Sequence, residues 1–586
     1  MPSDQDIRAF LGVTASLTGR AWTGPGIEDD RLAEAMIQRT GLPDAVARVL
    51  CRAGVESEGA EAYLAPSLRD LLPDPRGLLD MDAAADRFLQ AVLRHERIAI
   101  FGDYDVDGAA SSALLVAWLR EMGLTATLYI PDRIDEGYGP NVPAMAELAT
   151  GHDLIVCVDC GTLSHRPIAA ARGADVIVLD HHLGGETLPE CRAVVNPNRQ
   201  DEPGTLSHLC AAAVVFLLLV EVNRRLRETG RAGPDLMSML DLVALATVAD
   251  VAPLVGVNRA FVRQGLRVMG QRRRPGLVAL GDIARMEGAP TAYHLGFLLG
   301  PRINAGGRIG AADLGARLLS TADANEAAAL AERLDQLNTD RRAVEAEVRA
   351  AALAQAETRP MDGPLVWAAG IGWHPGVVGI VAARLKEATG RPAVVIGIDD
   401  GMGKGSGRSI GGVDLGAAVQ QLALEGAIEK GGGHRMAAGL SLAADRIEPA
   451  MARLGELLAR QGANEGEPRR LKVSAQLMPS GATADLIERI EAAGPFGMGA
   501  PAPTFAFADC RIAHVRRVGE THLKIRLAGD VGPSLDAIAF GAFDGPLGPA
   551  MEAHGGKRFH VLGRLELNRW GGRSQPQLRL IDAAIA

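Results

Sequence analysis

The sequence is poor in cysteine and in long apolar runs, and each scarcity excludes a class of protein. Six cysteines in 586 residues are too few for a disulfide-stapled scaffold. No uninterrupted apolar run reaches about 18 residues, so we expect no membrane-spanning helix and no membrane partner. The first residues, MPSDQDIRAFLG, lack the layout of a signal peptide. We therefore expect a protein of the reducing cytoplasm.

Positive charge and aromatic residues are also scarce. The net charge is −10, and the chain has only five Trp and five Tyr. From residue 468 to the end, however, 15 Lys and Arg stand against 11 Asp and Glu, so the last segment carries +4 and the preceding 467 residues carry −14. A mildly basic tail is compatible with a polyanion partner, although a solvated surface explains the count equally well. If the partner is a nucleic acid, contacts to its backbone should outweigh base stacking.

What the chain does contain is an alternation of short apolar runs with helix-like stretches. β-branched runs occupy 98–103, 126–131, 154–159, 175–180 and 193–197. This pattern predicts βαβ units around a buried parallel sheet. Residues 322–358 contain no Gly or Pro and predict one helix about 50 Å long that spans two domains.

A second α/β pattern and a strand-rich tail follow the long helix. Residues 365–397 repeat the strand and helix alternation, and about 110 terminal residues alternate strand-like runs with turns, as in a small β-barrel. The fold class is therefore α/β, with two α/β lobes joined by a long helix and a C-terminal oligonucleotide-binding-like (OB-like) barrel. The predicted parts are an N-terminal helical segment (1–75), a first α/β domain (76–265), a helical connector (266–360), a second α/β domain (361–465) and the barrel (466–586).

Acidic residues follow the predicted strands of the first lobe. Asp103, Asp105 and Asp107 come directly after the run 98–102, and Asp159 ends the next run. Asp180, His181 and His182 follow a third, and Asp250 lies in an apolar segment. The carboxyl ends of parallel strands meet at one edge of a sheet, so we expect these side chains to gather there.

The combination of carboxylates and imidazoles indicates a metal site. Each aspartate alone is explained by a turn or a helix cap, but the set together favours cations that offset the repulsion. Oxygen and histidine ligands suit Mn²⁺ or Mg²⁺. Two such ions about 3.5–4 Å apart could bridge a phosphate and activate water, which predicts hydrolysis of a phosphoester or phosphoanhydride.

The same residues carry a family resemblance. DYDVDG (103–108), VDCGT (158–162), DHH (180–182) and VADVAPL (248–254) resemble the four motifs of the DHH phosphoesterase superfamily, and GGGHRMAAG (431–439) resembles the signature of its DHHA1 domain. Within the superfamily the chain is most similar to the RecJ family. Further similar segments are YIPDRIDEGYG, GPRINAGGRIG, WHPGVVGIVAARL, GKGSGRSI and GPFGMGAPAPTF.

The resemblance implies a 5′-to-3′ exonuclease that hydrolyses single-stranded DNA in repair and recombination, with two Mn²⁺ or Mg²⁺ ions. It also implies single-strand-binding protein and a helicase as partners. By position, it implies metal ligands at Asp103, Asp105, Asp107, Asp159, His181 and Asp250. Asp159, His181, His182 and Asp180 would form the catalytic group, in which His182 contacts phosphate and Asp180 orients the histidines. Substrate-binding positions would be Arg302, Asn304, Arg308, Arg408, Ser409 and His434.

Two other functions stay open at this point. One is a DHH–DHHA1 phosphodiesterase for short oligoribonucleotides or cyclic dinucleotides, although such proteins are generally shorter and lack the terminal barrel. The other is a catalytically inactive DNA-binding scaffold, against which the full acidic set argues. The chain departs from the family pattern at Gly411 and Ala500, where a proline and an asparagine are expected.

Overall fold

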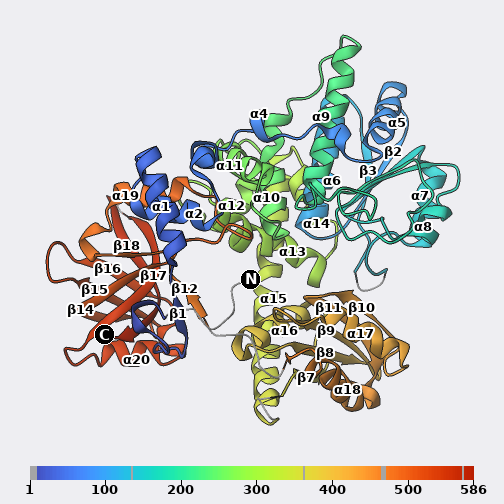
Figure 1. Cartoon of the computed structure of the whole chain (residues 1–586). Coiled ribbons are helices and arrows are strands. Elements are labelled where there is room, and N and C mark those ends of the chain that lie inside the picture. Colours follow the sequence, from blue (N-terminus) through green and yellow to red (C-terminus); the bar gives the residue numbers. More distant parts are fainter. Residues whose placement is uncertain (1–8, 134–135, 360–362, 464–469, 571–572) are drawn as a thin grey trace. The chain divides into compact units, whose positions relative to one another are not determined.

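The computed structural model describes residues 9–133, 136–359, 363–463, 470–570 and 573–586. The chain divides into two compact units (Figure 1). The first contains the residues up to Leu72, Pro253–Arg263 and Arg469–Ala586, and the second contains Pro73–Ala252 and Gln264–Pro468. Among the described residues, no helix combines the length and the apolar character needed to cross a bilayer.

The first lobe is built on a five-stranded sheet in which every strand is parallel. The strand order is β3-β2-β4-β5-β6, formed by β2 (Ile98–Gly102), β3 (Ala126–Tyr129), β4 (Leu154–Val158), β5 (Asp175–Leu179) and β6 (Ala193–Val195). β2 and β4 are buried along their whole length, because helices cover both faces of the sheet. The predicted parallel sheet is confirmed.

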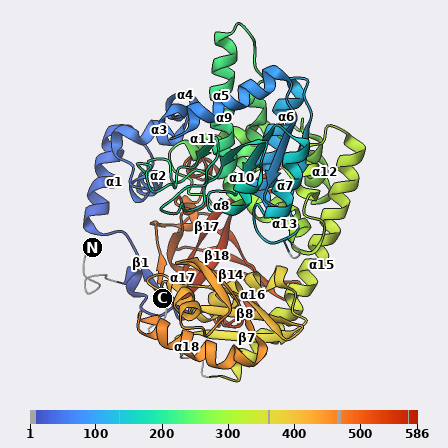
Figure 2. The same cartoon turned by 90° about the vertical axis from the view of Figure 1, so that its right-hand side faces the viewer.

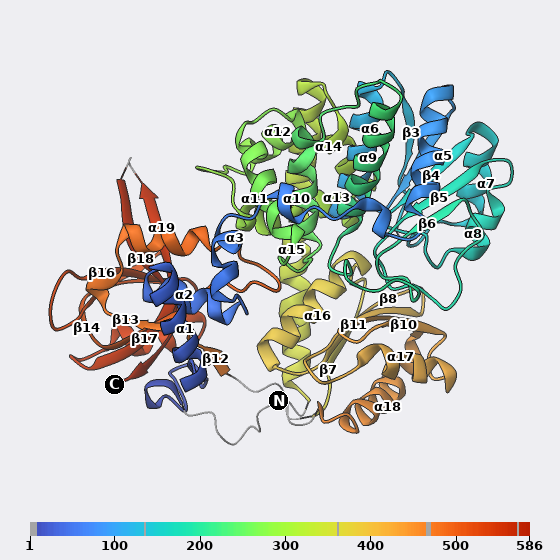
Figure 3. The same cartoon turned by 45° about the horizontal axis from the view of Figure 1, so that its top comes forward.

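The helices of this lobe lie on the two faces of the sheet. Figure 3 shows α7 and α8 on one side of the strands and α6 and α9 on the other. The helices are α5 (Met81–Arg94), α6 (Val106–Glu121), α7 (Val142–Gly151), α8 (His165–Ala170), α9 (Ala211–Glu228) and α10 (Leu240–Ala249). Gly108 in the first turn of α6 is required by close packing, since a Cβ there would lie 2.4 Å from the carbonyl oxygen of Asp103.

A helical connector leads to the long helix. It comprises α11 (Val257–Gly270), α12 (Pro275–Ile283), a π-helix η5 (His294–Leu299), α13 (Gly300–Ile309), α14 (Leu314–Ser320) and α15 (Ala324–Glu357). α15 has 34 residues, about 50 Å at 1.5 Å per residue, as predicted. It contacts α12 and α13 near its start and α16 further along, and α15 and α16 lie side by side (Figures 1 and 2).

The second lobe has a mixed five-stranded sheet. Its order is β10-β11-β9-β8-β7, formed by β7 (Val366–Ile371), β8 (Ala393–Asp399), β9 (Met402–Arg408), β10 (Lys430–His434) and β11 (Ala437–Ala443). Its helices are α16 (Pro375–Thr389), α17 (Leu415–Leu424) and α18 (Ile447–Ala459). The glycine-rich region between 397 and 439 thus forms strands as well as loops.

The other unit contains the predicted barrel. β14 (Phe505–Val518), β15 (His522–Ala528), β16 (Leu535–Ala539), β18 (Arg573–Ile585) and β17 (Arg558–Trp570) pair in this order, and β17 pairs back with β14 to close the ring. β12 (Arg470–Lys472), β13 (Ala475–Leu477), α19 (Ala484–Ala492) and α20 (Leu547–Glu552) complete the C-terminal part.

The N-terminal segment packs with this barrel. It contains β1 (Ala21–Thr23), α1 (Ile27–Thr40), α2 (Asp44–Arg52), α3 (Ala60–Leu64) and α4 (Leu68–Leu71). β1 pairs with β12 about 450 positions later, and the buried Trp22 indole donates to Asp582 over 2.9 Å. The described residues up to Leu72 are therefore grouped with the barrel, and the predicted domain boundaries stay predictions.

Candidate metal centre

Carboxylates and histidines collect at the carboxyl edge of the first sheet. Asp103 follows β2, Asp159 follows β4, and Asp180, His181 and His182 follow β5. Asp105 is the N-cap of α6, and one of its carboxylate oxygens accepts from the backbone N–H groups of Asp107 and Gly108. These positions are those that the strand pattern predicted.

Asp250 also lies at this edge, but a helix rather than a strand positions it. It is the C-cap of helix α10 and does not follow a strand. An apolar run alone does not distinguish a buried helix from a buried strand, so the sequence left this open.

Three overlapping groups of ligand atoms form at this edge. They are Asp103 with Asp105 and Asp159, Asp107 with His181 and Asp250, and Asp159 with His181 and His182. In each group the nearest ligand atoms lie within 4.8 Å of one another. His181 Nε2 lies 3.2 Å from Asp159 Oδ1 and 3.7 Å from Asp107 Oδ2, and its Nδ1 lies 3.8 Å from Asp250 Oδ2. All six residues predicted as metal ligands are brought together.

The buried carboxylates lack the partners that an ionised group needs. Asp103 is 4% exposed and Asp159 is 1% exposed, and one oxygen of each accepts no hydrogen bond. Burial, followed by the charge of Asp105, raises the pKa of Asp103, and burial with the charges of Asp107 and Asp105 raises that of Asp159. Divalent cations would supply the missing partners, and the oxygen and imidazole donors fit Mn²⁺ or Mg²⁺.

Asp107 is also buried but has backbone partners. Its two carboxylate oxygens accept from the N–H groups of Ala211 (2.7 Å) and Ala212 (2.8 Å) at the start of α9. The positive end of the helix dipole thus faces this carboxylate. Burial still raises its pKa.

Asp180 organises the histidine pair. It accepts from the backbone N–H of His181 and from Nδ1 of His182 at 2.8 Å, and Thr162 donates to its other oxygen. The hydrogen bond and charge of His182 outweigh burial and lower the pKa of Asp180. Burial lowers the pKa of His182, but Asp180 more than offsets this and raises it to about 9.

The sequence did not single out several residues that support this pair. Asn196 donates to the carbonyl of His182 and Asn198 to that of His181. The Tyr138 hydroxyl lies 3.2 Å from the His182 ring and donates to the Asp159 carbonyl. Asn196 and Asn198 follow β6, so the rule that located the aspartates also applies to them.

Among the predicted substrate residues, Asn304 contacts the start of α6 beside this centre, and Arg302 is engaged by α15. The Asn304 side chain accepts from the backbone N–H of Val106, which fixes the start of α6. Arg302 donates to Asp335 on α15 at 2.8 Å and to the Leu298 carbonyl.

A positively charged cavity of about 510 Å³ lies where α13 approaches the second lobe. Arg308 donates to the Gly376 carbonyl over 3.0 Å. Burial, with the nearby charge of Arg133, lowers the pKa of the Arg308 guanidinium. The polar side chains that line the cavity are Arg133, Arg308, Lys404, Ser406, Lys430 and Ser441.

The other predicted residues of the second lobe lie outside this lining. Arg408 donates to Ser406 Oγ and so stands behind it. The buried Ser409 hydroxyl donates to the Val413 carbonyl, and exposed His434 accepts from the Met436 N–H. Spacing alone did not distinguish Ser406, which faces the cavity, from Ser409.

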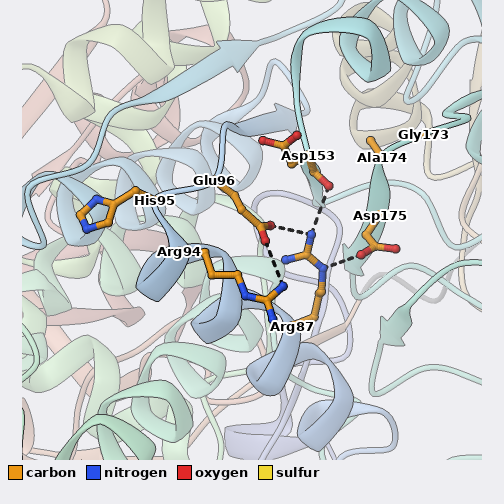
Figure 4. A pocket seen from close by; sticks show the side chains of 8 residues that line it. All are labelled: Arg87, Arg94, His95, Glu96, Asp153, Gly173, Ala174 and Asp175. Atoms are coloured by element: carbon orange, nitrogen blue, oxygen red, sulfur yellow. Dashed lines mark hydrogen bonds and ion pairs between the residues drawn. The ribbon is translucent and has the colours of Figure 1, made fainter.

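A larger cavity, of about 680 Å³, lies at the opposite edge of the first sheet (Figure 4). Arg87 there donates to Asp175 at 2.5 Å and to the Asp153 carbonyl, and pairs with Glu96 at 2.7 Å. Glu96 and Asp153 come just before β2 and β4, and Asp175 is the first residue of β5, so these acidic residues lie at the strand starts rather than after the strand ends. The network ties α5 to the strand starts and contains none of the predicted site residues.

Comparison with known proteins agrees with this arrangement. Residues 97–247 match the DHH family N-terminal domain, 362–460 the DHHA1 domain and 473–582 the RecJ OB domain. The chain is 40% identical over 566 residues to the single-stranded-DNA-specific exonuclease RecJ of Dickeya dadantii, covering 92% of this chain and 96% of that protein. It is 37% identical over 568 residues to RecJ of Escherichia coli, with coverage of 92% and 96%.

Solved structures of RecJ proteins also match this chain. The crystal structure of RecJ from Thermus thermophilus in complex with Mn²⁺ matches with a TM-score of 0.79 and 30% identity, over 96% of this chain and 79% of that one. A structure of exonuclease RecJ bound to manganese is 35% identical, with a TM-score of 0.57, over 65% of this chain and 95% of that one. By its sequence, its three matched domains and its fold, the chain belongs to the RecJ family.

Proposed function

We propose that this chain is a metal-dependent exonuclease that hydrolyses single-stranded DNA from the 5′ end, in repair and recombination. The observation that carries this is the set of three overlapping ligand groups, with orphaned carboxylate oxygens, at the carboxyl edge of the first sheet. The family relationship supplies the substrate, and the 5′-to-3′ direction rests on the sequence resemblance.

Each side chain of the centre has a task in this proposal. Asp103 and Asp105 would hold one ion, and Asp107, His181 and Asp250 would hold the other, with Asp159 within reach of both groups. When bound, the two ions supply Lewis acidity and lower the pKa of water. Asp180 and the two asparagines fix the histidine rings so that their nitrogens face the centre.

His182 serves as a proton-bearing group. In the metal-free protein, Asp180 raises the pKa of His182 to about 9, which favours a protonated ring at neutral pH with Nδ1–H bonded to Asp180. A cation at this place can stabilise the negative charge that develops on a phosphate, or donate its Nε2 proton to a leaving oxygen.

The cationic cavity would hold the phosphates of the strand. Arg133, Arg308, Lys404 and Lys430 present positive charge there, and Ser406 adds a hydroxyl. Arg408 stands behind Ser406 as a supporting residue, while Arg302 and His434 are proposed contacts further along the strand. We also propose single-strand-binding protein and a helicase as partners, and a cytoplasmic location, with which the six free cysteines are compatible.

The test compares single-stranded DNA labelled at either end, with Mn²⁺ and with EDTA. We expect Mn²⁺-dependent release of mononucleotides from the 5′-labelled end and little cleavage of duplex. Release from the 3′ end first would overturn the direction. Preference for a dinucleotide over a long strand would favour the short-oligonucleotide phosphodiesterase, and DNA binding without cleavage would favour the inactive scaffold.

A further inference from the structure

Two exposed aromatic rings lie at the π-helix η5, on Phe297 within the helix and on Tyr293 directly before it. Phe297 is 73% exposed and Tyr293 is 56% exposed. Their centroids are 5.2 Å apart with an angle of 22° between the planes, so the rings stack and present one extended apolar surface. Leu295 and Leu299 of the same helix are fully buried, so core packing is carried by the opposite side.

Exposed aromatic side chains are rare in this protein. Within the described parts of the chain, only Tyr138, Tyr293, Phe297 and Phe540 have at least half of their surface exposed. Tyr138 contacts His182 in the metal centre, and Phe540 lies in the barrel unit. Leaving the stacked pair largely exposed to water is therefore unusual in a chain with so few aromatic residues.

η5 is packed directly against the elements that carry metal-ligand residues. A Cβ on Gly296 would lie 3.3 Å from Val248 Cγ1. A Cβ on Gly300 would lie 3.4 Å from Ala249 Cβ and 3.9 Å from Val106 Cγ2. Val248 and Ala249 directly precede Asp250, and Val106 lies between Asp105 and Asp107. The helix at which the two rings lie is therefore packed against segments that also carry metal-ligand residues.

The helical spacing explains how the rings meet. Tyr293 and Phe297 are four positions apart, a spacing that makes side chains neighbours on a helix. π-Helical turns such as η5 are frequent at functional sites. His294 stabilises the start of this turn, since its Nδ1 accepts from the Thr291 N–H at 3.1 Å.

We propose that Tyr293 and Phe297 form a stacking platform for a base of the single strand whose phosphates enter the metal centre. This inference rests on the proposed function and extends it. The metal centre and the cationic cavity would contact phosphates, whereas the two rings would contact a base. A pair of rings is far smaller than the roughly 800 Å² that each partner contributes to a standard protein interface, whereas it matches one nucleobase. Stacking has no sequence requirement, as a general exonuclease needs.

The first test measures binding of oligothymidylate to the full chain in EDTA, by fluorescence anisotropy. We expect the Tyr293→Ala/Phe297→Ala variant to bind about tenfold more weakly, the range typical of removing one base stack. The DNA affinity of this variant should depend on salt as that of the parent does, because every phosphate contact is kept. Phe297→Trp should retain affinity and show fluorescence quenching on binding. Leu424→Ala, which removes another exposed apolar side chain, is the matched control.

The second test uses strands with a single abasic site, placed in turn at successive positions from the 5′ end. At one position, the abasic site should weaken binding by the parent about as much as the two substitutions weaken binding of the intact strand. The same abasic site should not weaken binding by the double variant any further. Equal binding by parent and double variant, or additive losses at every position, would overturn the platform. Concentration-dependent self-association that the double variant abolishes would overturn it too, in favour of a second copy as occupant.

The two proposals fail separately. If the parent releases no nucleotide with Mn²⁺, the exonuclease proposal is rejected, while the EDTA binding data still decide the platform. If the parent degrades the strand and the double variant does so with unchanged KM, only the platform is rejected. A thermal melt of each variant identifies any loss of binding that comes from misfolding.

Discussion

The two α/β lobes carry opposite charge on their sheets, and they do so by different structural means. In the first lobe all strands are parallel, and the carboxylates stand after the strands, where loops and helix starts hold them. In the second lobe the cations stand within antiparallel strands. Lys404, Ser406 and Arg408 alternate along β9 with Gly403, Gly405 and Gly407.

The glycines explain why this second sheet is charged on one side only. A Cβ on Gly403 or Gly405 would lie 3.0 Å from side-chain carbons of Ile396, and one on Gly407 would lie 2.7 Å from Leu415. The glycine side of β9 is thus pressed against the apolar core, and the polar side chains are left on the side of the cavity. Strand ends suit a compact metal cage, whereas a strand face suits an extended polyanion.

The largest expected effect comes from breaking the carboxylate cage. Asp159→Asn should lower turnover of single-stranded DNA at least about 10³-fold, because metal assistance supplies several kcal/mol to the transition state. Without metal, the same variant should melt at a higher temperature than the parent, because it removes a buried, repelled carboxylate. Cleavage near the parental rate would show that Asp159 is not a metal ligand.

The carboxylates of the first lobe should make the stability of the metal-free protein depend on pH. Burial, with the charges of Asp107 and Asp105, raises the pKa of Asp250 to about 8, from 3.8. The folded chain therefore favours the protonated form of Asp250. The contribution of this protonation to the free energy of unfolding is full below pH 3.8 and is lost as the pH rises through 8. We expect the melting temperature of the metal-free protein to fall between roughly pH 6 and 8.

Mn²⁺ should reverse this trend, since bound ligands are ionised and metal binding strengthens as they lose protons. Stabilisation by Mn²⁺ should then grow from roughly pH 6 to 8, and it should total about 2.7 kcal/mol where the ion is at 100 times its Kd. The matched control is Asp250→Asn, whose metal-free melting curve should depend less on pH. An identical pH slope in the two proteins would contradict the assignment to Asp250.

A smaller effect is expected from the cationic side. Lys404→Gln/Lys430→Gln should weaken binding of single-stranded DNA about tenfold and lower the salt slope by about 0.7 for each phosphate that is no longer neutralised. Stabilisation by Mn²⁺ should be unchanged. Lys386→Gln on α16, which does not line the cavity, is the control. A salt slope equal to that of the parent would remove the two lysines from the DNA path.

The smallest effect separates two neighbouring serines. Ser406→Ala should raise the Kd for DNA a fewfold without changing the melting temperature, since its hydroxyl lines the cavity. Ser409→Ala should lower the free energy of unfolding by about 1 kcal/mol, because it removes the buried hydrogen bond to Val413, and leave DNA affinity unchanged. The reverse pattern would restore Ser409 as the substrate contact that the resemblance implies.

Much of the first lobe could be predicted because its signals are local. Runs of apolar residues indicated the strands, and the residue after each run marked the site, as for Asp103, Asp159 and Asp180. The long helix was evident from the absence of Gly and Pro in 322–358. Asp250 was also among the predicted ligands, but the element that carries it needed the tertiary structure, since periodicity does not separate a short buried helix from a buried strand.

The second lobe and the barrel unit were less predictable because their decisive features are pairings. Whether Ser406 or Ser409 faces the cavity depends on the path of the chain after β9, which spacing does not reveal. The pairing of β1 with β12 joins segments about 450 residues apart, and no local pattern records such a partner.

By itself the sequence determined the order of strands and helices, the long helix and the position of Asp103, Asp159 and Asp180 after apolar runs, because each depends on residues close together in the chain. Only the tertiary structure decided that Asp107 is held by the start of α9, that Asp250 ends a helix and that the exposed rings of Tyr293 and Phe297 stack on each other. These features arise from contacts between distant segments, whose free energy depends on packing in three dimensions rather than on neighbouring residues.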